Sequence, residues 1–223
     1  MTTLEITNIV LAGTTFLAVL VALFGRTFWD WFNRPKLEVA VRKTQRPLGV
    51  KKDEMHVSGI FAEDKVYFVE LGITNTGRNP AENVEVFLSK RFYKALDTNE
   101  YAEQTFATPI NLCWLGADRN CDIDEKRYMP RIGPNSTRYC SLGWVYPPKG
   151  TGLYGSSGMG LDITSQQFEW AHLLLGPAWF KLIIEVSASN ARPVIREMEI
   201  LISGNWSDEE EEMFKEHLRI SLS

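Results

Sequence analysis

The sequence predicts an all-β domain, a β-sandwich, between one N-terminal transmembrane helix and a short C-terminal amphipathic helix. Three observations predict this: alternating apolar and polar residues from residue 37 onward, an uncharged apolar run before it, and a helix-start pattern near the end. A length of 223 residues suits one domain with an appendage. The net charge of -4 does not suit a nucleic-acid-binding protein, and 3 cysteines do not suit a disulfide framework.

The N-terminal segment is predicted to cross a membrane. We expect a short non-cytoplasmic N-terminus over residues 1–8, a transmembrane helix over 6–28 and an interfacial juxtamembrane segment over 29–36. Residues 6–25 carry no charge, and about 20 apolar residues span a bilayer core. A cleaved signal peptide and a buried core helix are the alternatives. The side chains expected at the membrane interface are those of Arg26, Trp29, Trp31 and Arg34.

Basic residues predict the orientation of this helix. They follow the apolar run, whereas no lysine or arginine precedes it. Because positive charge is retained on the cytoplasmic side, we expect a single-pass protein of the cell inner membrane whose C-terminal domain is cytoplasmic. The lipid bilayer is then one partner, through residues 6–28, and a protein at the membrane is the other.

Residues 37–204 are predicted to form the β-sandwich, because apolar residues recur there at every second position. Asn75–Pro80 is a dense turn signal between two such runs. The segment 189–192 is expected to close a hairpin, and 168–175 to form a short helix. The expected strands lie at 37–41, 56–61, 66–74, 83–88, 110–115, 136–145, 161–164, 179–188 and 193–203.

Residues 205–223 are predicted to form the C-terminal helix. Ser207 and Glu210 have the spacing of a capping box, and the acidic run 208–212 complements the positive end of a helix dipole. The acidic run is interpreted as a solvated helix start, with a docking site as the alternative.

Three segments resemble strands of a known module. Phe68–Leu88, with its Asn-Thr-Gly turn and Val-Glu-Val strand, resembles bacterial immunoglobulin-like β-sandwich modules of the cell-adhesion-related type. Segments 132–143 and 175–191, each entered through a Gly-Pro turn, resemble later strands of such modules. The resemblance implies an immunoglobulin-like fold and indicates no activity.

Patterns for catalysis or metal binding are incomplete. Asp118, Asn120, Asp122 and Asp124 open like a calcium loop, but the glycine and glutamate that such a loop requires are missing. No catalytic residue, cofactor or metal site is therefore predicted. The glycine-rich segment 147–161 is either a surface connection or a partner-binding loop, whose candidate residues are Lys149, Gly150, Tyr154, Gly155, Met159 and Gly160.

The sequence therefore predicts a protein-interaction or ligand-sensing module rather than an enzyme, with recognition by loops that include 149–160 and 75–79. The alternative is an accessory subunit of a membrane complex, assembled through the helix surface of Gly13, Thr14 and Thr15. An unrecognised enzyme is the third hypothesis.

Overall fold

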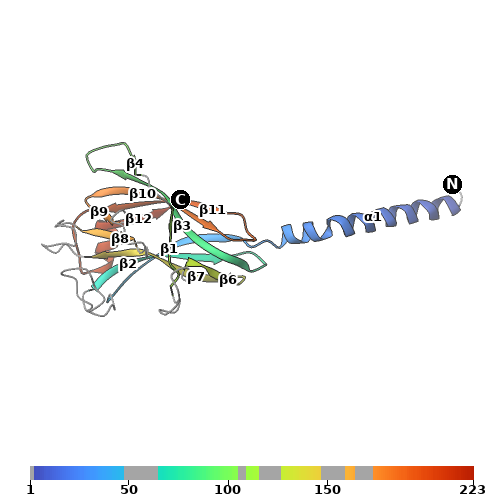
Figure 1. Cartoon of the computed structure of the whole chain (residues 1–223), viewed down its shortest axis with the longest axis horizontal. Coiled ribbons are helices and arrows are strands. Elements are labelled where there is room, and N and C mark those ends of the chain that lie inside the picture. The colour runs from blue at the N-terminus through green and yellow to red at the C-terminus, as the bar shows by residue number, and fades with distance from the viewer. Residues whose placement is uncertain (1–2, 48–64, 105–108, 116–126, 147–158, 164–172) are drawn as a thin grey trace.

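The protein consists of a long N-terminal helix and a two-sheet β-domain (Figure 1). The structure is a computed structural model, and it describes residues 3–47, 65–104, 109–115, 127–146, 159–163 and 173–223. The elements are α1 (Thr3–Phe32), β1 (Leu37–Pro47), β2 (Lys65–Asn75), β3 (Ala81–Lys94), β4 (Ala102–Gln104), β5 (Ile110–Asn111), β6 (Met129–Ile132), β7 (Ser136–Tyr146), β8 (Gly160–Ile163), β9 (Leu173–Leu175), β10 (Ala178–Ser187), β11 (Val194–Ile202), α3 (Glu210–Glu212), a π-helical turn (Met213–His217) and β12 (Leu218–Leu222).

Two antiparallel sheets make up the β-domain. One has the strand order β1-β2-β7-β8-β9, and the other has the order β12-β11-β10-β3-β4, with β5 and β6 also pairing with β3. The predicted strands around Leu37, Tyr67, Val84, Ser136 and Leu161 are all present. The predicted hairpin is confirmed, since β10 and β11 pair in antiparallel register from Ala178↔Ile202 to Val186↔Val194.

The hydrophobic core takes side chains from both sheets. Leu71 of β2 and Ile184 of β10 are both fully buried in one cluster, as their alternating patterns predict. They belong to different sheets, because β2 pairs with β1 and β7 whereas β10 pairs with β11 and β3. β2 is buried on both faces, and even its outward Glu70 is 1% exposed.

The prediction of a transmembrane helix is wrong. Among the residues that the structure describes, no helix is both long enough and apolar enough to cross a bilayer. The inner-membrane location and the cytoplasmic orientation depended on this span and lose their support with it.

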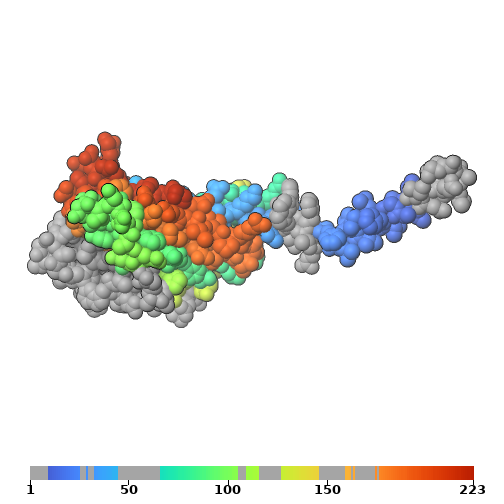
Figure 2. Space-filling view, turned by 90° about the horizontal axis from the view of Figure 1, so that it is seen from above, coloured from blue at the N-terminus to red at the C-terminus, as the bar shows by residue number. Residues whose placement is uncertain are grey.

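α1 extends away from the β-domain in both views (Figure 1, Figure 2). Several large apolar side chains of this helix are exposed, among them Leu11 and Phe16 at 65% each. The small-residue surface predicted at Gly13, Thr14 and Thr15 has its hydroxyls satisfied within the helix. Thr14 Oγ1 donates to the carbonyl of Val10 at 3.0 Å, and Thr15 Oγ1 donates to that of Leu11 at 2.8 Å.

The prediction of a C-terminal amphipathic helix over residues 205–223 is also wrong. Only α3 and the following π-helical turn are helical, and residues 218–222 form β12, the edge strand that pairs with β11. The cause is a period of two, which places Leu218, Ile220 and Leu222 on one face of a strand. Because β12 joins a sheet, the β-domain continues beyond the predicted boundary at residue 204.

Two other expectations differ from the structure. The helix predicted over 168–175 is not formed in its described part, because Leu173–Leu175 is β9 and pairs with β8. In the segment 110–115, only β5 and an isolated bridge between Trp114 and Cys140 are present. The strand predicted over 56–61 and the acidic loop at 118–124 lie outside the described residues.

An aromatic cluster packs the C-terminal segment against β2. The Tyr67 ring lies 4.9 Å from the Trp206 ring and 5.2 Å from the Phe214 ring, centroid to centroid. The Tyr67 hydroxyl donates to the carbonyl of Ser207 at 2.7 Å. The predicted capping box of Ser207 and Glu210 is not formed, because the N-cap residue of α3 is Glu209 and has no side-chain cap. The Ser207 hydroxyl instead accepts from the backbone N–H of Glu209 and donates to the Glu212 carboxylate.

The stability of the protein should fall as the pH rises from 10 to 12. Burial, reinforced by Asp208 and its acidic neighbours, raises the pKa of Tyr67 to about 12. The unfolded chain loses this proton near pH 10, so the folded state binds more protons than the unfolded state in that window. Urea unfolding of the full chain across this range tests the expectation. The Tyr67→Phe variant should show a shallower decline, and an equal decline would contradict it.

Candidate anion-binding site

A hollow of about 680 Å³ lies where the chain passes from α1 into the β-domain. We call it the basic hollow, because four cationic side chains line it and none of its lining residues is acidic. Three chain segments meet there: 34–37 from the end of α1 to the start of β1, 76–78 between β2 and β3, and 192–194 at the start of β11. The cationic residues are Arg34, Lys36, Arg78 and Arg192.

The first wall of the basic hollow is organised by Asn75, a fully buried amide at the end of β2. Its Oδ1 accepts hydrogen bonds from the backbone N–H of Lys36 at 3.2 Å and of Gly77 at 3.0 Å. Its Nδ2 donates to the carbonyls of Asn79 at 2.8 Å and Ile132 at 3.1 Å. One side chain therefore ties the segment after α1 to the β2–β3 turn and to β6.

The two segments of this wall are in direct backbone contact at Gly77. A Cβ atom at this position would lie 2.5 Å from the Lys36 nitrogen and 2.6 Å from the Arg34 carbonyl oxygen. The Thr76 N–H also donates to the Lys36 carbonyl at 2.8 Å. Only glycine permits an approach this close, so the first wall depends on Gly77.

The second wall is the β10–β11 turn, which carries Arg192. Asn190 anchors this turn to the start of β3: its Nδ2 donates to the Pro80 carbonyl at 2.9 Å, and its Oδ1 accepts from the Glu82 N–H at 3.1 Å. The Ser189 N–H donates to the Glu82 carbonyl at 2.9 Å. Both walls are thus fixed by hydrogen bonds independently of any ligand.

Three of the four cationic side chains, those of Arg34, Lys36 and Arg192, are available for binding. They are exposed to solvent, and none of them forms an ion pair within the described part of the chain. The Glu38 carboxylate, which does not line the hollow, accepts a hydrogen bond from Thr76 Oγ1 at 3.0 Å. Cations that converge from separate segments onto one concave surface produce a positive potential suited to an anion.

The partner-binding loop predicted from the sequence lies mostly outside the described residues. Lys149, Gly150, Tyr154 and Gly155 are in that undescribed part. The two remaining candidates belong to the sheet and core. Met159 is fully buried, and Gly160 pairs with Tyr146 and Leu175 as the first residue of β8. In contrast, Thr76, Gly77 and Arg78 from the predicted loop 75–79 line the basic hollow.

The four residues predicted at a membrane interface have different surroundings. Trp29 is 68% exposed on α1, and Arg34 lines the basic hollow. The side chains of Arg26 and Trp31 lie outside the described part. The structure therefore places one of these residues, Arg34, beside cations from other segments.

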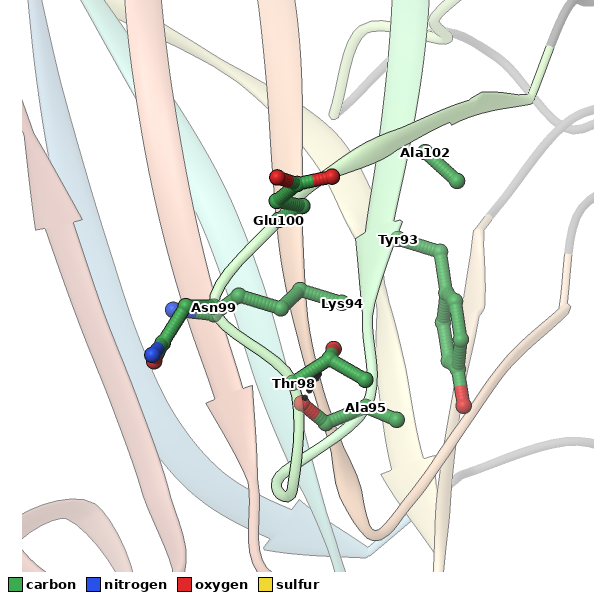
Figure 3. A pocket seen from close by; sticks show the side chains of 7 residues that line it. All are labelled: Tyr93, Lys94, Ala95, Thr98, Asn99, Glu100 and Ala102. Atoms are coloured by element: carbon green, nitrogen blue, oxygen red, sulfur yellow. Dashed lines mark hydrogen bonds between the residues drawn. The ribbon is translucent and has the colours of Figure 1, made fainter.

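A second hollow, of about 510 Å³, lies beside the turn between β3 and β4 (Figure 3). Its labelled side chains do not converge, because Tyr93 and Asn99 point away from each other on opposite sides of the turn. Lys94, which lines this hollow, lies over the rings of Tyr101 at 4.9 Å and Trp179 at 5.4 Å. Lys94 is therefore engaged in contacts that hold the turn against the sheet. The basic hollow is the better candidate for a ligand-binding site.

Comparisons with known proteins do not identify a family. No family model and no curated protein matches the chain. A Bordetella pertussis crystal structure provisionally named ApaA is similar at 12% identity and a TM-score of 0.28, covering 73% of this chain and 88% of that one. The Northeast Structural Genomics Consortium target SoR45 is similar at 10% identity and a TM-score of 0.30, covering 78% and 92%. The cell-adhesion-related resemblance stays a prediction.

Most of the basic hollow could not be found by reading the sequence. Arg34, Arg78 and Arg192 are far apart along the chain, and each has ordinary neighbours for an exposed arginine. The one local signal was the turn at 75–79, whose Asn-Thr-Gly pattern indicates a tight bend with a polar side chain that bonds its own backbone.

Proposed function

We propose that the chain is a recognition module that binds an anionic ligand in the basic hollow, and that it is not an enzyme. The observation that carries this proposal is the convergence of Arg34, Lys36, Arg78 and Arg192 from three separate segments on a concave surface without an acidic lining residue. A volume of about 680 Å³ suits a small molecule, because ligand pockets commonly hold about 300 to 1,000 Å³.

The fixed walls support binding as well. Asn75 and Asn190 hold the backbone on the two sides of the hollow through side-chain hydrogen bonds of 2.9 to 3.2 Å. A ligand that enters such a site does not have to order the loops around it, which reduces the free-energy cost of association. Recognition at loop ends carried by a rigid sandwich is also the arrangement that the sequence predicts.

The described side chains favour binding over catalysis. Burial raises the pKa of the Cys140 thiol, which keeps it protonated and poorly nucleophilic. In the part of the chain that the structure describes, histidine, cysteine and carboxylate residues form no cluster suited to a metal ion. The basic hollow itself offers cations to bind an anion but no paired base and nucleophile.

Calorimetric titration of the full chain with inorganic phosphate, citrate and tripolyphosphate tests the proposal. At least one of these anions should bind, and the Arg34→Ala/Arg192→Ala double variant should lose at least about tenfold in affinity, since each charged hydrogen bond contributes about 1.5 kcal/mol or more. Spermine, a cation, should not bind at this site.

The matched control is the Lys215→Ala/Arg219→Ala double variant, which removes the same charge from exposed residues outside the hollow. It should bind the anion as the unmodified chain does. Equal losses in both double variants would mean that affinity follows net charge, and the proposal would then be wrong.

A further inference from the structure

We infer that the ligand of the basic hollow carries at least two oxoanion groups, phosphate or carboxylate, and bridges its two walls. The inference rests on the proposed function and makes it more specific. The first wall presents Arg34 and Lys36, and the second presents Arg192 on a different turn. Each wall has its own hydrogen-bonded anchor, so each is a separate recognition element.

The preference for oxoanions follows from the hydrogen-bond donors that remain available to a ligand. The backbone N–H groups of Lys36, Thr76 and Gly77 are all used inside the first wall. A backbone cradle of the kind that binds a single phosphate is therefore not available from these residues. Recognition falls to side chains, and the planar guanidinium groups of Arg34 and Arg192 match the paired oxygens of phosphate and carboxylate.

The need for two groups follows from the arrangement of the walls. The segments 34–36 and 76–78 touch each other through Gly77, so they act as one surface. Arg192 lines the same hollow from a separate turn, which Asn190 holds to the start of β3. A lone anion on either wall meets exposed cations that water screens, whereas a ligand that reaches both walls gains the second contact without a second loss of translational freedom.

Calorimetry of the full chain at constant ionic strength distinguishes one group from two. Tripolyphosphate and citrate, which carry several oxoanion groups, should bind at least about tenfold more tightly than inorganic phosphate. If tripolyphosphate binds and citrate does not, phosphate groups are the relevant chemistry; the reverse result selects carboxylates. Either result supports a bridging ligand.

Single-wall variants test the bridge itself. Arg34→Ala and Arg192→Ala should each reduce the affinity for the bridging anion about tenfold, to near that of inorganic phosphate. Arg192→Lys should recover only part of the lost affinity, because a lysine ammonium keeps the positive charge but lacks the paired N–H donors of a guanidinium. Circular dichroism and the melting temperature of each variant show whether it is folded.

The outcomes separate the inference from the proposed function. If none of the three anions binds the unmodified chain, both are wrong. If inorganic phosphate binds as tightly as tripolyphosphate and citrate, or if removing Arg192 leaves the affinity for the larger anions unchanged, the hollow binds anions on one wall, and only the inference is wrong.

Discussion

Replacing Asn75 with alanine is expected to lower the free energy of unfolding by about 3 to 5 kcal/mol. The side chain is fully buried and makes four hydrogen bonds, to two backbone N–H groups and two carbonyls. Alanine leaves these groups without partners, and each unsatisfied buried group costs about 1 to 3 kcal/mol. Urea unfolding of the full chain measures the loss.

Thr76→Ala is the matched control for this change. Thr76 is the next residue and is exposed, and its hydroxyl bonds only Glu38 and, at 3.4 Å, the Lys36 carbonyl. The free energy of unfolding of the Thr76→Ala variant should stay within about 0.5 kcal/mol of that of the unmodified chain. If the Asn75 variant loses no more than the Thr76 variant, the amide does not organise the first wall. The Asn75 variant should also bind the anion more weakly, because the segment after α1 is released.

Replacing Leu71 with alanine is expected to cost about 2 to 5 kcal/mol, and replacing Ile184 a similar amount. Both side chains are fully buried in the cluster shared by the two sheets. Each truncation removes the transfer free energy of its methyl groups and leaves a cavity that a densely packed core fills only in part. The melting temperature and the urea midpoint of the full chain report the loss.

Ile195 provides the control for the core prediction. It is on β11 and is 61% exposed, so the Ile195→Ala variant changes the same kind of side chain outside the core. Its effect should be within about 0.5 kcal/mol. A Leu71 variant as stable as the Ile195 variant would show that the assignment of the inward face of β2 is wrong.

Strands could be predicted wherever the apolar period was two, because that period fixes which side chains share a face. The register and the neighbours of a strand could not, since Leu71 and Ile184 have the same pattern and lie in different sheets. At the C-terminus two signals compete. The acidic run favours a helix, but Leu218, Ile220 and Leu222 complete the edge of a sheet, and tertiary pairing prevails over local propensity.

The candidate site was predictable only in part, for a different reason. The turn at Asn75 is a local feature, and its bonds to Gly77 and Asn79 lie within the turn. Its bonds to Lys36 and Ile132 join segments 39 and 57 residues away, and no short pattern encodes them. The convergence of Arg34 with Arg192 likewise depends on which strands become neighbours.

The acidic run and the basic hollow lie at opposite ends of the β-domain. The segment 208–217, dark red in Figure 1, leaves β11 at the end farther from α1, whereas the hollow borders the residues that follow α1. These two clusters place charges of opposite sign at the two ends of the described part of the β-domain. If the basic hollow binds a small anion, as we propose, its cationic side chains should attract that anion before contact. Its association rate should therefore decrease as added salt shortens the Debye length.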